Sequence, residues 1–180
     1  KYGPKSARGL WAYVKRLNED RAKKISAAIV EFASQHSVDT IVMEHLDFKG
    51  CKKRGSKAQR LSMWNHGIIR EKVEQKAHLL GIRIATICAW KTSALAFDGS
   101  GSVTRDDNNH ALAKFTTGKQ YNCDLSASYN IGARYFIREL LKSLPATEES
   151  RVKAKVPDAG RRTSCTLSTL RMLVKELSAA

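Results

Sequence analysis

Few acidic residues, few cysteines and no long apolar run characterise this sequence. Its 180 residues contain 17 Asp and Glu, four Cys and three Pro. The apolar runs fall well short of the roughly 18–20 residues that a membrane-spanning helix needs, so we expect no membrane partner. Hydrophobic residues still make up 42% of the chain, which favours a packed globular domain over a disordered basic tail.

The cysteines are too widely spaced to form a local metal site. Cys51, Cys88, Cys123 and Cys165 include no CxxC pair and no Cys–His pair at ligand spacing. This spacing excludes a zinc knuckle or ribbon, and we expect no zinc. A chain of this length can build a core without disulfides, so we expect free thiols in a reducing compartment. The corresponding location is the cytoplasm, in association with the nucleoid.

What the chain has in excess is positive charge. It carries 32 Lys and Arg, which gives a formal net charge of +15 at pH 7. Such a charge on a folded domain favours nucleic acid as the partner, because Lys and Arg release the counterions condensed on a phosphate backbone. An acidic protein partner, or solubility alone, would explain the same composition.

Periodic apolar residues predict a long amphipathic helix near the start of the chain. Ser6 can cap this helix after Pro4, and it should end near His36. Its apolar side is formed by Leu10, Val14, Leu17, Ile25, Ile29 and Phe32. A second helix, over residues 61–80, should stop at Gly81.

Two β-branched apolar runs, at residues 38–48 and 82–90, predict buried strands. A basic loop over residues 49–57 follows the first strand. Residues 92–120 show neither a helical nor a strand period, apart from a possible short turn at 111–115. An irregular stretch of this length inside a compact domain is usually functional or mobile.

The rest of the chain predicts helices separated by a linker. One helix should begin near Asp124 and end at Pro145, a charged linker should run to Arg162, and a last helix should cover residues 167–178. This order of elements (helix, strand, helix, strand, loop, helix) corresponds to half of an α/β sheet domain. The two strands are parallel if each helix is a crossover. Two strands cannot bury so many apolar helix faces. We therefore expect the rest of the sheet to lie upstream of Lys1, or on another chain.

Two acidic residues lie where ligands collect in such a domain. Glu44 ends an apolar strand, where a carboxylate is costly unless it is solvated, paired or bound to a metal, and Asp124 begins a helix. A solvated strand end and a helix N-cap are the ordinary explanations. In an open α/β sheet, however, strand ends and helix starts surround the ligand site, and carboxylates that hold Mg²⁺ suit phosphodiester hydrolysis in a basic protein.

Three stretches resemble the RuvC-type nuclease domain of TnpB and the type V CRISPR effectors. IVMEHLDFKG is similar to the second RuvC motif, and WNHGIIREKVEQKAHLLGIRIATICAWKTS resembles the helix and strand that follow it. GKQYNCDLSASYNIGAR is similar to the third motif, with Asn130 and Ile131 matching directly and Ala127 and Ser128 in place of two alanines. The resemblance covers roughly residues 7–138.

This resemblance implies an α/β, RNase H-like (RuvC) fold that lacks its N-terminal strands. Residues 1–143 would form the partial nuclease domain, with a loop insertion at 92–120, and residues 144–180 a charged linker and an extra C-terminal helix. The family's first catalytic Asp, on an N-terminal strand, has no counterpart here. The family often has four cysteines in the insertion, whereas Ala96 and Gly99 stand where the first pair would fall.

By the same resemblance, the complete protein would be an RNA-guided DNA endonuclease that uses two metal ions, Mg²⁺ or Mn²⁺. Glu44 and Asp124 would be catalytic metal ligands, and this chain alone should be inactive. The implied partners are guide RNA, the target and displaced DNA strands, and the remainder of the RuvC domain upstream of Lys1. Two alternatives are a nuclease-inactive, RNA-guided DNA-binding protein and a basic structural RNA-binding domain, in which the two acids would lie far apart.

Basic and aromatic residues provide candidate contacts to nucleic acid. The basic ones are Lys52, Lys53, Arg54, Lys57, Arg60 and Lys119. A solvated loop explains the first five equally well. Tyr121, close to Asp124, is a candidate for stacking on a base, whereas Trp64 and Trp90 are expected in the core.

Overall fold

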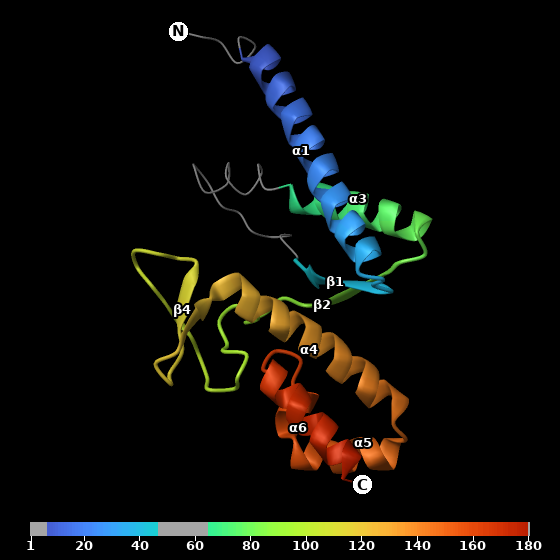
Figure 1. Ribbon diagram of the computed structural model, residues 1–180, viewed down its shortest axis with the longest axis vertical. Coiled ribbons are helices and arrows are strands. Elements are labelled where there is room, and N and C mark those ends of the chain that lie inside the picture. Colours follow the sequence, from blue (N-terminus) through green and yellow to red (C-terminus); the bar gives the residue numbers. More distant parts are fainter. Residues whose placement is uncertain (1–6, 47–64, 180) are drawn as a thin grey trace. The chain divides into compact units, whose positions relative to one another are not determined.

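The structure is a computed structural model that describes residues 7–46 and 65–179 (Figure 1). Its elements are, in order, α1 (Arg8–Gln35), β1 (Thr40–His45), α3 (His66–Leu79), β2 (Arg83–Cys88), β3 (Thr104–Arg105), β4 (Leu112–Lys114), β5 (Gln120–Asn122), α4 (Cys123–Ser143), α5 (Ala146–Lys155), the 3₁₀ helix η1 (Pro157–Gly160) and α6 (Leu167–Ser178). β1 and β2 form a two-stranded sheet, and β3, β4 and β5 form an antiparallel sheet. The predicted α/β class is confirmed.

The chain divides into two compact units. The first contains α1, α3 and the opening residues of β1 and β2. The second contains the remainder of these two strands and the whole chain from Ala85 onward. Among the described residues, no helix is both long and apolar enough to cross a membrane.

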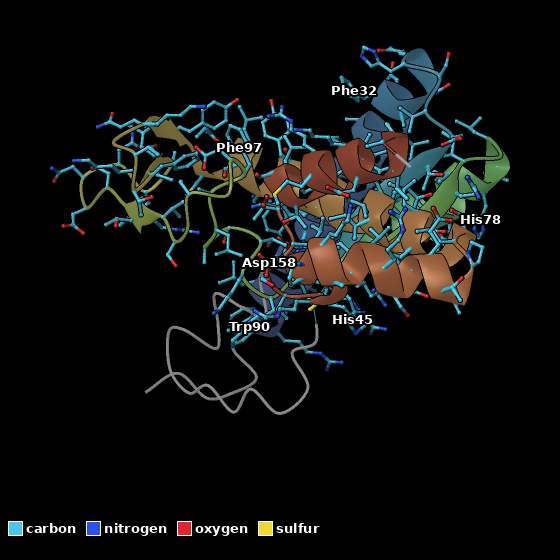
Figure 2. The ribbon with its side chains drawn as sticks, turned by 90° about the horizontal axis from the view of Figure 1, so that it is seen from below. Phe32, His45, His78, Trp90, Phe97 and Asp158 are labelled. Atoms are coloured by element: carbon cyan, nitrogen blue, oxygen red, sulfur yellow. The ribbon has the colours of Figure 1, made fainter. Side chains whose placement is uncertain are left out.

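In the first unit, α1 packs against α3 through small side chains. The buried residues are Ala22, Ser26, Val30 and Ala33 on α1 and Val73 and Ala77 on α3. The predicted extent of α1 is confirmed. The predicted apolar side is wrong, since Leu10 is 63% exposed and Phe32 is 62% exposed (Figure 2). The neighbouring stripe of small residues is the buried one. The N-cap is Ala7, with no side-chain hydrogen bond, and Ser6 lies outside the described residues.

The two predicted strands form, but they are not buried. Every side chain of β1 is half-buried or exposed, and Ile87 is the buried residue of β2. A sheet of two strands leaves much of its surface uncovered, which explains the difference. Gly81 ends the preceding helix as predicted, because it adopts a left-handed conformation with φ of 71° directly after Leu80.

The segment predicted as irregular contains three short strands. β3, β4 and β5 have two or three residues each, which is too short for a sequence period, and β4 occupies the predicted turn at 111–115. Ala96, Ala113, Phe115 and Cys123 form its core, with Phe97 packed against them (Figure 2). We call this part, residues 92–122, the small lobe.

The predicted charged linker is wrong, since it holds α5 and η1. Glu148 and Glu149 lie in the first turn of α5 and Lys153 and Lys155 in its last, which suits the helix dipole. One hydrophobic cluster joins this segment to the helices before and after it: Ile137, Val152, Val156, Ala159, Cys165 and Leu173. Residues on both sides of position 143 therefore share one core.

Leu173 tests this shared core. It is fully buried, so Leu173→Ala should lower the free energy of unfolding by about 3 kcal/mol through lost burial and a cavity. The adjacent Met172 is 52% exposed, and Met172→Ala should cost less than about 1 kcal/mol. Urea denaturation followed by circular dichroism measures both. Equal losses in the two variants would contradict the packing described here.

Candidate active site

Glu44 is held by a side chain that follows β2. Its side chain is half-buried, and Thr92 Oγ1 donates a hydrogen bond to Glu44 Oε1 at 2.5 Å. Thr92 is buried in a turn that includes Lys91, whose φ of 60° is unusual for a residue with a side chain. The turn therefore presents the Thr92 hydroxyl to one carboxylate oxygen of Glu44.

Asn130 of α4 fixes the same turn from the other side. Its side chain is 0% exposed, and Nδ2 donates to the carbonyls of Thr92 at 3.0 Å and Leu95 at 2.9 Å. Its Oδ1 accepts from the backbone N–H of Leu167 at 3.3 Å. One buried amide thus connects α4 to the Thr92 turn and to the start of α6.

Asp124 lies in the first turn of α4, but it does not cap the helix. Asn122 is the N-cap, since its Oδ1 accepts from the N–H groups of Asp124 at 2.9 Å and Leu125 at 3.0 Å. The Asp124 side chain is exposed, with no hydrogen bond or ion pair to another described residue. The N-cap explanation for Asp124 is therefore wrong.

Asp124 lies on α4, and Glu44, on β1, is connected to the same helix through Thr92. Glu44 is connected to Asn130 through two successive hydrogen bonds at Thr92, and Asp124 lies six residues before Asn130, or about 9 Å along the helix axis. Carboxylate oxygens are the ligands that Mg²⁺ and Mn²⁺ prefer, so the chemistry of this pair suits either ion. Within residues 7–46 and 65–179, no group of three His, Cys, Asp or Glu is arranged to hold a metal. The assignment of Glu44 and Asp124 as metal ligands therefore stays a prediction.

Arg134, one turn after Asn130, is a buried cation. It is 5% exposed and donates to four carbonyls, those of Cys88, Trp90, Thr163 and Cys165, at 2.7–3.2 Å. Burial lowers the pKa of the guanidinium, while negative charge nearby, including that of Glu44, opposes this shift.

Arg138, a further turn along, binds the neighbouring part of β2. Its Nη1 donates to the carbonyl of Thr86 at 2.8 Å, and its Nε donates to Glu139. Arg134 and Arg138 therefore bind carbonyls two residues apart on one strand.

Lys119 and Tyr121, both predicted to contact nucleic acid, lie together in the small lobe. Lys119 Nζ is 5.1 Å from the centre of the Tyr121 ring and 4.7 Å from that of Phe97. The Tyr121 hydroxyl is 3.4 Å from that of Tyr129, and this hydrogen bond raises the pKa of Tyr121. Tyr129, which is exposed on α4, was not identified from the sequence, because only the folded lobe brings it to Tyr121.

The remaining predicted contacts to nucleic acid lie outside the described part of the chain: Lys52, Lys53, Arg54, Lys57 and Arg60. Trp64, which was expected in the core, lies outside it as well. The expectation that Trp90 lies in the core is wrong, since Trp90 is 65% exposed (Figure 2). Its backbone carbonyl accepts a hydrogen bond from Arg134.

The fold is similar to one found in an RNA-guided complex. It matches a chain of the Cas12f1–sgRNA–target DNA complex, determined by cryo-EM, with a TM-score of 0.54 and 22% sequence identity. The match covers 71% of this chain and 36% of that chain, so this chain spans little more than a third of its neighbour. No protein-family model matches the sequence, and no curated protein matches it. The similarity to the Cas12f1 complex is therefore one of fold.

Proposed function

We propose that this chain is the part of an RNA-guided DNA endonuclease that carries the second and third RuvC motifs. The observation that carries the proposal is the connection of Glu44, through Thr92, to the helix that contains Asp124. This connection occurs in a fold similar to that of a chain in the Cas12f1 complex. In this proposal the fold is RNase H-like, and guide RNA and target DNA are the partners. A guide pairs with the target, while the protein binds the backbones of both strands.

The proposed reaction is hydrolysis of a DNA phosphodiester bond. Glu44 and Asp124 would hold Mg²⁺ or Mn²⁺ together with at least one further acid from another part of the protein, or from another chain. When bound, the ions supply an activated water and stabilise the leaving oxygen. Thr92 holds one oxygen of Glu44 and so fixes the direction of the other, which is the role of an outer partner of a ligand.

The small lobe and the first turns of α4 together supply a surface for the DNA strand near Asp124. Tyr121 and Tyr129 offer partly exposed rings on which a base can stack, and Lys119 adds a positive charge beside them. Stacking on aromatic rings requires an unpaired base, so this surface favours single-stranded DNA as the substrate. The basic residues that follow β1 in the sequence (Lys52, Lys53, Arg54, Lys57 and Arg60) would contact the phosphates.

A nuclease-inactive, RNA-guided DNA-binding protein is the second candidate. It would use the same fold and the same nucleic-acid contacts. The carboxylate of Asp124 is exposed and does not cap α4. This favours the nuclease, because an acidic side chain there only repels DNA unless a cation is bound to it. Cleavage assays on acid-to-alanine variants separate the two candidates.

The acid pair is tested in the complete guide-bound protein. Glu44→Ala or Asp124→Ala should lower the rate of DNA cleavage by several orders of magnitude, because each removes a metal ligand. Binding of target DNA should be retained, since phosphate contacts come from Lys and Arg. Glu74→Ala, at an exposed position on α3, is the matched control and should cleave like the parent. If Asp124→Ala also cleaves like the parent, the nuclease proposal is wrong.

Thr92 tests how Glu44 is positioned. Thr92→Val keeps the shape of the side chain but removes the hydroxyl, and it should lower the cleavage rate about 10- to 100-fold, as loss of an outer-sphere partner does. Thr92→Ser keeps the hydroxyl and should restore most of the rate. The Mn²⁺ concentration needed for half-maximal cleavage should rise in the valine variant alone. An unchanged Mn²⁺ dependence with a lower melting temperature would show that Thr92 is only structural.

A further inference from the structure

A second candidate site is lined in part by Arg134 and includes neither Glu44 nor Asp124 in its lining. The second unit contains a cleft of about 680 Å³ between β2, α4, α5 and the segment after η1. Its apolar lining includes Ile137, Leu141, Leu144 and Ala159. Its charged lining consists of Arg134, Arg138, Lys142, Lys153 and Arg162 and of one acid, Glu149.

Three of these five cations already have an acidic partner. Arg138 and Lys142 share Glu139, at 2.8 Å and 3.4 Å, and these contacts hold the pKa of Glu139 below its usual value. Lys153 pairs with Glu149. Within the described ranges, Arg134 and Arg162 form no ion pair with any carboxylate.

Arg134 and Arg162 both line the cleft, and the Arg134 side chain is connected to the backbone next to Arg162 through Thr163. Arg134 Nη2 donates to the carbonyl of Thr163 at 2.9 Å, and Thr163 directly follows Arg162. A guanidinium group has more N–H donors than the four bonds of Arg134 use. Two like charges beside apolar walls produce a strong local positive potential, because the walls screen them less than water does. A bound anion would offset this potential.

We propose that this cleft binds a nucleotide, with its phosphate on Arg162 and Arg134. Guanidinium groups bind phosphate with directed, charge-assisted hydrogen bonds. The cleft is far larger than a phosphate ion and falls in the range of small-molecule sites, so its apolar lining has room for the sugar and base. The nucleotide is either free or an unpaired nucleotide of a nucleic-acid strand. Neither Glu44 nor Asp124 takes part, so this site goes beyond the proposed nuclease.

The test is a titration of the 180-residue chain with AMP, followed by calorimetry in the presence of EDTA. Chelation removes divalent metals, so the result does not depend on the acid pair. Arg162→Glu should weaken AMP binding about tenfold or more, as loss of a charge-assisted hydrogen bond does. Arg171→Glu makes the same charge change at an exposed position of α6 outside the cleft, and AMP affinity should stay within about twofold of the parent.

A short single-stranded ribo-oligonucleotide, measured by fluorescence anisotropy, distinguishes the two sources of the nucleotide. AMP binding that is sensitive to Arg162→Glu indicates a free nucleotide, and the same sensitivity for the oligonucleotide alone indicates a strand. Equal weakening by Arg162→Glu and Arg171→Glu would mean diffuse attraction to a basic protein and would overturn the proposal. So would the absence of binding by the parent chain to either probe. Circular dichroism confirms that both variants fold, and Arg162→Ala replaces Arg162→Glu if the latter does not.

Discussion

The buried guanidinium of Arg134 joins three parts of the second unit. It donates to Cys88 and Trp90 at the end of β2 and to Thr163 and Cys165 before α6. Burying a cation is costly unless its hydrogen bonds are made, and backbone carbonyls from both segments make them here. Arg134 therefore helps to hold both the end of β2 and the segment before α6 on α4. Asn130, one turn earlier, repeats this arrangement with an uncharged amide.

The periodic elements of the fold were predictable, and the packing between them was not. α1, α4 and α6 carry long apolar periods, and their extents agree with the structure. The buried side of α1 could not be read from its largest residues, because α3 packs against small ones such as Ala22 and Ala33. The strands of the small lobe were missed because they have two or three residues each. The helix α5 was missed because it is rich in charged residues and buries a single valine, Val152.

In the candidate site, too, the sequence indicates some residues, and only the tertiary structure shows the contacts between them. Glu44 and Asp124 were identified because their positions in two motifs and at element ends are local properties of the sequence. The contact that orients Glu44 is not local, since Thr92 lies 48 residues from Glu44 and 38 from Asn130. Tyr129 joins Tyr121 for the same reason, through the fold of the small lobe and the first turns of α4. Sequence therefore indicates the acids, and tertiary structure determines which oxygen of Glu44 stays available.

The arginines of α4 also change what β2 can bind. The carbonyls of Thr86 and Cys88 point to the same side of the strand, since alternate residues do so, and Arg138 and Arg134 occupy them. Unpaired carbonyls along a strand normally invite another strand to add to the sheet, which leads to domain swapping or aggregation. An incoming strand would have to displace two charged side chains, one of them buried and bound to four carbonyls. The helix α4 thus protects β2 from pairing with a strand of another molecule. This protection comes from occupied carbonyl groups and does not depend on repulsion between two basic chains.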